Sequence, residues 1–300
     1  MRIESIEAFL KVLKGELRGS DPATVQDALF DAEDHLRSAL ESARAEDPDT
    51  EEQKALQAIF ASYGSPAETA AAYREIEQRV DPALTKPAGS AERNLAARFF
   101  SVYIDPAAWA ALLYLLISLL TGVVFFSWAV TGLSVSIATS IFIFGLPLAA
   151  FFLLSTRGLA LIEGRIVEAL LGLRMPRRPL FTTRETSWFE YLKDMLADRH
   201  TWSLLAYMLL QLPLGVFYFS LTVSLLATSL SLVVAPILQL LFDFPLMTIG
   251  SIGNSVWVVP DGLLAPISLG GFLILTATLH LARGLGHLHG RLARAMLISD

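Results

Sequence analysis

The chain has 300 residues, of which 54% are hydrophobic and 17% are charged, and its formal net charge is −6. Soluble globular proteins carry about 25% charged residues, so this composition indicates an integral membrane protein. The chain contains no cysteine, which excludes disulfides and thiol catalysis.

The charges are distributed unevenly along the chain. Residues 1–90 contain 10 Lys and Arg and 18 Asp and Glu, a net charge of −8, whereas the remaining 210 residues have a net charge of +2. An acidic segment repels phosphate, so we expect no nucleic-acid binding. Residues 1–17 mix charged with apolar side chains, so no signal peptide is expected there.

The first 80 residues predict a small helical domain. Apolar residues recur at helical spacing in three segments, at about 3–17, 22–45 and 50–63. Thr50 is a suitable N-cap for the third of these helices. Ser65 and Glu68 have the spacing of a capping box, which predicts the start of a fourth helix.

Three features of this domain together resemble the HAAS-type family of α-helical signalling domains in bacterial membrane proteins. They are the order of the short helices, the acidic second helix with Asp31, Glu33 and Asp34, and the turn at residues 63–68. The resemblance covers residues 1–80. It implies a cytoplasmic domain that binds a protein partner, which could be a transcription factor, a kinase or a permease. Residues 81–92, rich in Pro, Gly and Ser, are expected to be a linker.

Two long stretches without Asp, Glu, Lys or Arg follow. The first lies between Asp105 and Arg157 and is long enough for two spans of about 20 residues each, with a turn near Gly132. The second lies at 200–242, where residues 228–241 would continue a third span or lie at the membrane interface. The sequence therefore predicts an all-α membrane domain with spans at about 107–130, 134–155, 202–227 and 267–285.

The membrane half also contains an internal repeat, which divides it into copies at 93–180 and 181–300. Residues of the first copy recur 93 positions later: Asp105, Trp109, Tyr114, Gly122, Phe126 and Ser127 match Asp198, Trp202, Tyr207, Gly215, Phe219 and Ser220. Further on, residues 157–159 and 164–165 recur 126 positions later. The second copy thus carries 33 additional residues, which predicts an insertion at about 242–266.

The basic residues predict the orientation. None of the thirteen Lys and Arg residues after residue 90 lies in the turn near Gly132 or in the insertion. By the positive-inside rule, both termini, the helical domain and the central connection are expected to be cytoplasmic, and the insertion extracytoplasmic. With four spans, the two copies have the same orientation and form a tandem repeat.

Amphipathic segments at the predicted cytoplasmic ends of the spans would either lie in the headgroup layer or continue the spans. Their basic residues are expected to face anionic lipid: Arg157, Arg165, Arg174, Arg283, Arg291 and Arg294. The lipid bilayer is therefore the first expected partner.

No pattern in the chain indicates catalysis, a cofactor or a metal site. Asp105 and Asp198 are expected to cap spans, and Glu163 to form interfacial salt bridges with Arg165 and Arg174. His280, His287 and His289 lack neighbouring residues that would complete a ligand set, and His289 is expected at the interface.

The insertion is the least repeated segment. Its Asp243, Trp257 and Asp261 are candidates for contact with an extracytoplasmic ligand, although the sequence favours a simple re-entry loop over a ligand site. Residues 255–259 could form a short strand.

Five segments of the membrane half resemble the putative sensor domain family, which often precedes histidine kinases: 103–106, 122–131, 163–165, 170–176 and 281–297. The resemblance covers residues 99–297 and implies a sensor. We therefore expect a multi-pass protein of the bacterial cytoplasmic membrane that relays a signal through residues 1–80, either alone or as a homo-oligomer.

The sequence leaves two other functions open. A permease-like or transporter-associated subunit would need polar groups at mid-membrane, where the sequence offers little beyond Ser118, Thr121, Ser127 and Gln211. An interfacial lipid-modifying enzyme would use Glu163, Arg165 and the histidines.

Overall fold

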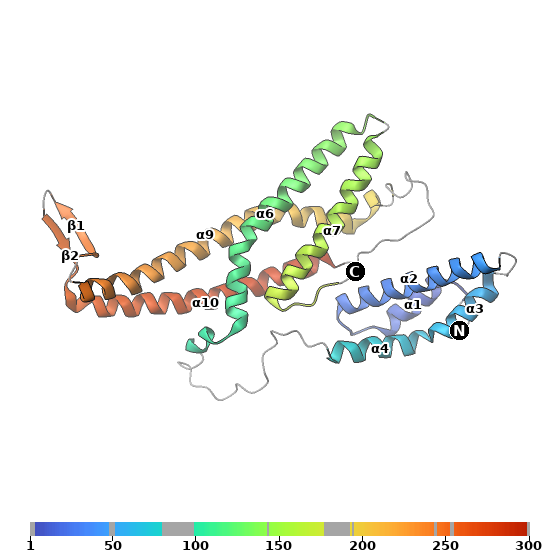
Figure 1. The fold of residues 1–300 in the computed structure, drawn as a ribbon, viewed down its shortest axis with the longest axis horizontal. Coiled ribbons are helices and arrows are strands. Elements are labelled where there is room, and N and C mark those ends of the chain that lie inside the picture. The colour runs from blue at the N-terminus through green and yellow to red at the C-terminus, as the bar shows by residue number, and fades with distance from the viewer. Residues whose placement is uncertain are drawn as a thin grey trace.

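The computed structural model describes residues 4–47, 52–79, 99–142, 144–176, 193, 195–242, 245–252 and 255–298. These residues form a bundle of short helices, four long helices and one β-hairpin (Figure 1). The predicted all-α fold with a four-span domain is confirmed.

The short helices form the N-terminal bundle, and they are α1 (Ile6–Glu16), α2 (Pro22–Glu46), α3 (Glu52–Tyr63) and α4 (Pro66–Arg79). Their apolar stripes bury a core that includes Phe9, Leu13 and Leu36. The capping box is present, because the Ser65 N–H donates to the Glu68 carboxylate at 2.8 Å and the Glu68 N–H donates to Ser65 Oγ at 3.3 Å. The predicted Thr50 cap lies outside the described residues.

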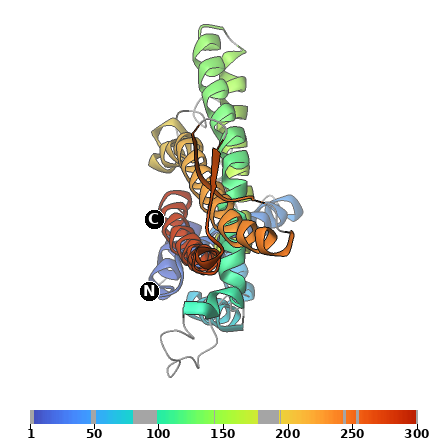
Figure 2. The ribbon, with the colours of Figure 1, turned by 90° about the vertical axis from the view of Figure 1, so that its left-hand side faces the viewer.

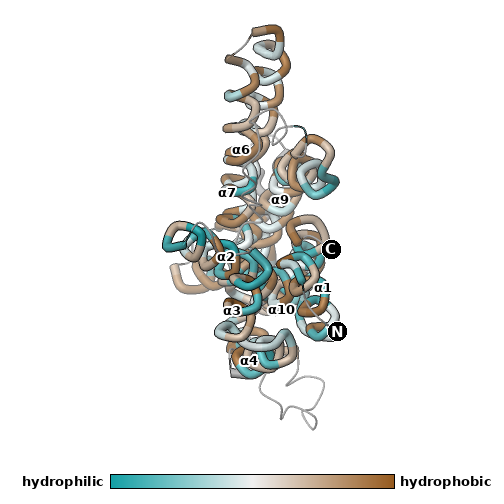
Figure 3. Tube along the Cα trace, turned by 90° about the vertical axis from the view of Figure 1, so that its right-hand side faces the viewer, coloured by the Kyte–Doolittle hydropathy of each residue, from teal (hydrophilic) through white to brown (hydrophobic). Residues whose placement is uncertain are grey.

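The long helices are α6 (Pro106–Thr139), α7 (Gly145–Leu171), α9 (Arg199–Phe242) and α10 (Asp261–Leu297), and a short 3-10 helix, η1 (Ser101–Tyr103), precedes α6. Each is long and apolar enough to cross a membrane. Figure 3 shows the contrast between the hydrophilic bundle and these hydrophobic helices. The amphipathic segments after the second and fourth spans continue α7 and α10 as helix.

The predicted turn near Gly132 is wrong. Helix α6 runs through this residue to Thr139, and the described turn residues are 140–142 and 144. Gly132 is required for packing, because a Cβ there would lie 2.0 Å from the ring of Phe152 on α7. A glycine in a span is therefore a contact point here rather than the end of a helix.

The additional residues of the second copy extend the α9–α10 hairpin. Helix α9 has 44 residues against 34 in α6, and α10 has 37 against 27 in α7. Residues 228–241 thus belong to α9. The insertion is shorter than predicted, because α10 already begins at Asp261. Within the insertion, β1 (Thr248–Ile252) pairs with β2 (Ser255–Val258) as a hairpin, and β2 lies where a strand was expected.

The base of this hairpin is held by a buried glutamine. Gln239 Nε2 donates to the carbonyl of Val259 at 3.3 Å, and Gln239 Oε1 accepts from the Met247 N–H at 2.9 Å. One side chain of α9 thus fixes both ends of the connection to α10.

Helices α6 and α9 cross, and the α6–α7 and α9–α10 hairpins point away from each other beyond the crossing (Figures 1 and 2). Two glycines permit the close approach. A Cβ on Gly122 would lie 2.6 Å from the carbonyl oxygen of Gln211, and a Cβ on Gly215 would lie 2.3 Å from that of Ser118. The backbones of α6 and α9 are therefore in contact at this point.

Candidate functional site

All four long helices contribute to one buried polar cluster, which we call the Glu163 cluster. Its members are Tyr114 on α6, Glu163 on α7, Tyr207 and Gln211 on α9, and His289 on α10, and each is at most 1% exposed. Polar groups in the interior of an apolar helical domain are costly unless they are hydrogen-bonded. The cluster is therefore the leading candidate for a functional site.

The carboxyl group of Glu163 is the centre of the cluster. Its Oε1 accepts hydrogen bonds from Tyr114 Oη at 2.7 Å, from Gln211 Nε2 at 3.0 Å and from Tyr207 Oη at 3.1 Å. Tyr207 Oη also lies 3.0 Å from His289 Nε2, and the ring of Tyr218 meets the His289 ring edge-on. Hydrogen bonds thus connect the four helices through a few side chains.

Three buried atoms of the cluster have no hydrogen-bond partner: Glu163 Oε2, Gln211 Oε1 and His289 Nδ1. Each unpaired buried group costs about 1–3 kcal/mol. Two of them are acceptor oxygens, each of which can accept a hydrogen bond from a water molecule. In the part of the chain that the structure describes, no group of three His, Asp or Glu side chains could hold a metal ion.

The predicted positions of Glu163 and His289 are wrong. Glu163 does not pair with Arg165, because two helical positions differ by about 200° and the two side chains leave α7 in opposite directions. Arg165 instead pairs with Glu168 and donates to the carbonyl of Pro176 at 2.7 Å. His289 is 0% exposed and lies in the core, not at the interface.

The sequence contained a signal for this cluster. Tyr114 and Tyr207 occupy matching places in the two copies, and so do Glu163 and His289. Each copy thus has a tyrosine in its first helix and a polar residue, Glu163 or His289, in its second helix. Such a repeated arrangement indicates that these residues share a polar contact in the interior.

Two ion pairs link the beginning of α6 to α10 and the beginning of α9 to α7. Asp105 lies 2.7 Å from Arg283, and Asp198 lies 3.0 Å from Arg157. The two aspartates also cap their helices as predicted, since Asp105 accepts from the N–H of Ala107 and Asp198 from that of His200. Each pair thus joins the first helix of one copy to the second helix of the other.

Other contacts also recur at positions 93 residues apart. The indole of Trp109 donates to the carbonyl of Tyr103 at 3.0 Å, and that of Trp202 to the carbonyl of Leu196 at 2.8 Å. The glycine contacts of the α6–α9 crossing also recur 93 residues apart. Gly122 matches Gly215, and Ser118 matches Gln211.

The six arginines predicted to face lipid have different environments. Arg157 and Arg283 lie in the two ion pairs, and Arg294 pairs with Asp21 of the N-terminal bundle at 2.5 Å. Arg291 is exposed, whereas Arg174 is partly buried, with a buried Nε that has no hydrogen-bond partner. Contact of these residues with lipid stays a prediction.

The extracytoplasmic candidates are only partly described. Asp261 is exposed in the first turn of α10, and Trp257 belongs to strand β2, where only the backbone of this residue is described. Asp243 lies outside the described residues. Their grouping into one ligand site stays a prediction.

The two ion pairs lead to a test by double-mutant cycle. Arg157→Ala and Asp198→Ala should each lower stability in detergent, with a coupling free energy of about 1 kcal/mol, because the aspartate is partly exposed to solvent. Thermal unfolding of the single and double variants measures it. Arg291→Ala is the matched control and should have no effect; additive effects of the first two variants would contradict the pairing.

Four apolar helices joined by a buried polar cluster define a multi-pass membrane protein. Residues 114–297, more than half of the chain, match the model of the family described as "Putative sensor", and the chain belongs to this family. The resemblance stated for the membrane half is thereby confirmed. No curated protein and no solved structure matches the chain.

Proposed function

We propose that the protein is a sensor of the bacterial cytoplasmic membrane that relays a change in the packing of its long helices to a cytoplasmic partner through residues 1–80. Both termini lie in the cytoplasm in this proposal, as the arginine distribution favours. The observation that carries it is the contact between the bundle and α10, the helix that also supplies His289 to the Glu163 cluster.

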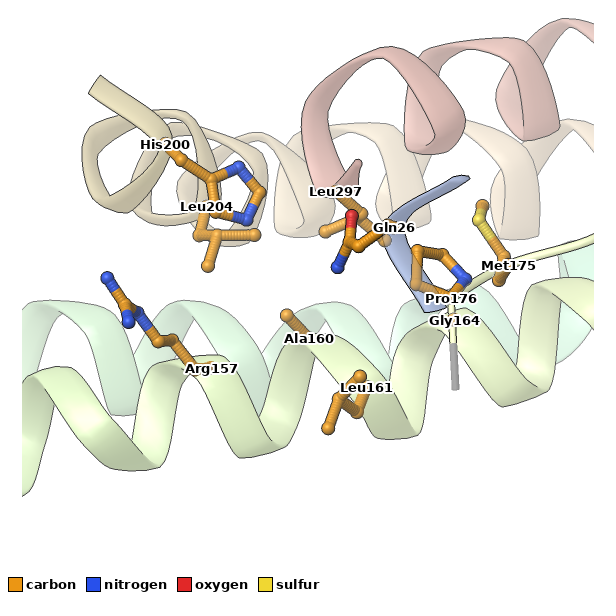
Figure 4. A pocket seen from close by; sticks show the side chains of 10 residues that line it. All are labelled: Gln26, Arg157, Ala160, Leu161, Gly164, Met175, Pro176, His200, Leu204 and Leu297. Atoms are coloured by element: carbon orange, nitrogen blue, oxygen red, sulfur yellow. The ribbon is translucent and has the colours of Figure 1, made fainter. Parts of the chain in front are cut away.

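The bundle contacts the long helices through the start of α2. Asp21 caps α2 by accepting from the Ala23 N–H at 2.9 Å, and it pairs with Arg294 on α10. Ala23 is fully buried and belongs to the apolar core of the long helices. Figure 4 shows Gln26 of α2 beside Leu297, in a small pocket between the bundle and the long helices.

The path from the cluster to the bundle is short. His289 and Arg294 lie five residues apart on one continuous helix, which is about 7.5 Å along its axis. A shift of α10 that breaks the contact of His289 with Tyr207 would therefore displace Arg294 from Asp21. Such a shift requires a signal that favours one packing over the other.

The internal repeat supports a movement of two units against each other. The ion pairs, the tryptophan contacts and the crossing glycines all recur between matching positions, which suits an approximate two-fold relation of the α6–α7 and α9–α10 hairpins. In this proposal the hairpins pivot at Gly122 and Gly215, and a HAAS-like bundle reads the movement.

The relay is tested by exchanging the bundle. In the native cell, replacing residues 1–80 with an unrelated helical domain should abolish the transcript changes that distinguish the wild-type strain from a deletion strain, while the membrane half remains inserted. Crosslinking from the bundle would then identify the partner. A wild-type transcript profile with the exchanged bundle would refute the relay.

The contact between Asp21 and Arg294 gives a second, biophysical prediction. Because the chain has no cysteine, one dye on the bundle and one on the membrane half can report their separation. Asp21→Arg should separate the two parts through charge repulsion, and the double variant Asp21→Arg with Arg294→Asp should restore the contact. Arg291→Asp, one turn away on α10, is the control; equal separation in all variants would contradict the contact.

The permease-like alternative gains one observation. Glu163 is a buried carboxyl group in a span, and such groups often mark ion or proton paths. Uptake or efflux in reconstituted vesicles that is lost in Glu163→Gln would favour this function. The interfacial enzyme has less support, because Glu163 and Arg165 leave α7 in opposite directions and His280 binds the carbonyl of Phe99.

A further inference from the structure

A basic groove lies at the turn between α1 and α2 of the N-terminal bundle. It has a volume of about 720 Å³, and its lining includes Lys11, Lys14 and Arg18 but no carboxylate. The apolar side chains of Val25 and Leu29 form part of its wall. This composition differs from that of the surrounding segment, since residues 1–90 have a net charge of −8.

The three cations of the groove are available to a ligand. Lys11, Lys14 and Arg18 are exposed, and within the described residues none of them forms an ion pair. Three unpaired like charges around one groove repel each other, so an anion that enters the groove is favoured by all three.

The groove lies next to the long helices. Pro22 and Gln26 line it, and Gln26 also lines the small pocket shared with Arg157 and His200 (Figure 4). Asp21, directly before Pro22, pairs with Arg294 near the end of α10. The bundle therefore presents its basic groove at the arginine-rich ends of the long helices, where the lipid headgroups of the cytoplasmic leaflet are expected.

We propose that this groove binds the phosphate headgroup of an anionic phospholipid from the cytoplasmic leaflet. Lysine and arginine side chains bind phosphate oxygens through charge-assisted hydrogen bonds, and the apolar wall suits the glycerol and first methylene groups of the lipid. The site goes beyond the proposed relay and does not depend on it, since it requires only that the bundle lies at the membrane surface.

The experiment uses the full chain in nanodiscs. Ser20→Cys at the edge of the groove carries a fluorophore, and the discs contain phosphatidylcholine with either brominated phosphatidylglycerol or brominated phosphatidylcholine as quencher. We expect the phosphatidylglycerol discs alone to quench strongly. The double variant Lys11→Glu with Arg18→Glu should require about tenfold more phosphatidylglycerol for the same quenching. A label at Gly15→Cys, where the glycine has no neighbour within 4 Å, repeats the test at a second site.

A control variant separates the groove from the overall charge. The double variant Arg44→Glu with Lys54→Glu changes the net charge by the same amount as the groove variant, but at residues of α2 and α3 that do not line the groove. Its fluorophore should be quenched as in the wild type. Equal quenching by both brominated lipids, or an unchanged response in the groove variant, would overturn the proposal. Quenching that inorganic phosphate or an acidic peptide abolishes at physiological ionic strength would also overturn it, because the groove would then prefer a soluble anion. Circular dichroism checks that each variant is folded.

Discussion

Gly122→Ala and Gly215→Ala are expected to destabilise the membrane half by about 1–3 kcal/mol each, the cost of adding one methyl group to a tightly packed contact. At both positions the new Cβ would lie within 2.6 Å of a backbone carbonyl oxygen of the facing helix. Neither carbonyl can rotate away like a side chain, so α6 and α9 must separate. Unfolding of the purified protein in detergent, followed by circular dichroism, measures the loss.

The chain offers matched controls for this result. Gly158 on α7 and Gly284 on α10 lie within helices and have no neighbour within 4 Å, so their replacement by alanine should leave stability unchanged or raise it by up to about 1 kcal/mol. The double variant Gly122→Ala with Gly215→Ala should cost less than the sum of the single variants, because the first change already separates the helices. Equal effects at all four glycines would show that α6 and α9 do not cross as described.

Composition and charge placement predicted the fold class well, because charged residues are so costly in hydrocarbon that their absence identifies spans. Helix ends on the arginine-rich side were also predictable, since Asp105 and Asp198 are recognisable caps. The opposite ends were not. Gly132 resembled a turn residue, but whether a glycine ends a helix or admits a neighbouring ring depends on the helix packed against it.

The candidate site was harder to predict than the fold. The sequence shows Glu163 close to Arg165 and Arg174, and neighbours along the chain suggested salt bridges. Its true partners, Tyr114, Tyr207 and Gln211, come from other helices and can be identified only when the rotation of each helix about its axis is known. The residues that recur 93 positions apart supply part of that information, because Asp105 and Asp198 make matching contacts, and so do Trp109 and Trp202.

Replacing Glu163 should have the largest effect of any substitution in the polar cluster. Glu163→Leu removes the acceptor of three hydrogen bonds, so the donors of Tyr114 and Gln211 lose their shortest contact. Tyr207 keeps only its contact with His289 Nε2. At about 1–3 kcal/mol for each unpaired group, the total loss of stability is several kcal/mol. The packing of all four long helices should loosen together, because each contributes a member to the cluster.

Glu163→Gln keeps a hydrogen-bond acceptor at this position but removes the carboxyl group, so it tests the two contributions separately. Its carbonyl oxygen can still accept from the three donors, and its new amide N–H group takes the place of Glu163 Oε2, which already lacks a hydrogen-bond partner. We therefore expect Glu163→Gln to unfold close to the wild type and Glu163→Leu far below it. Glu168→Leu, on the same helix and partly exposed, is the control for loss of a carboxylate and should cost less than about 1 kcal/mol. If Glu163→Leu were as stable as Glu168→Leu, the cluster would not hold the four helices together, and α10 could not transmit a signal from it to Arg294.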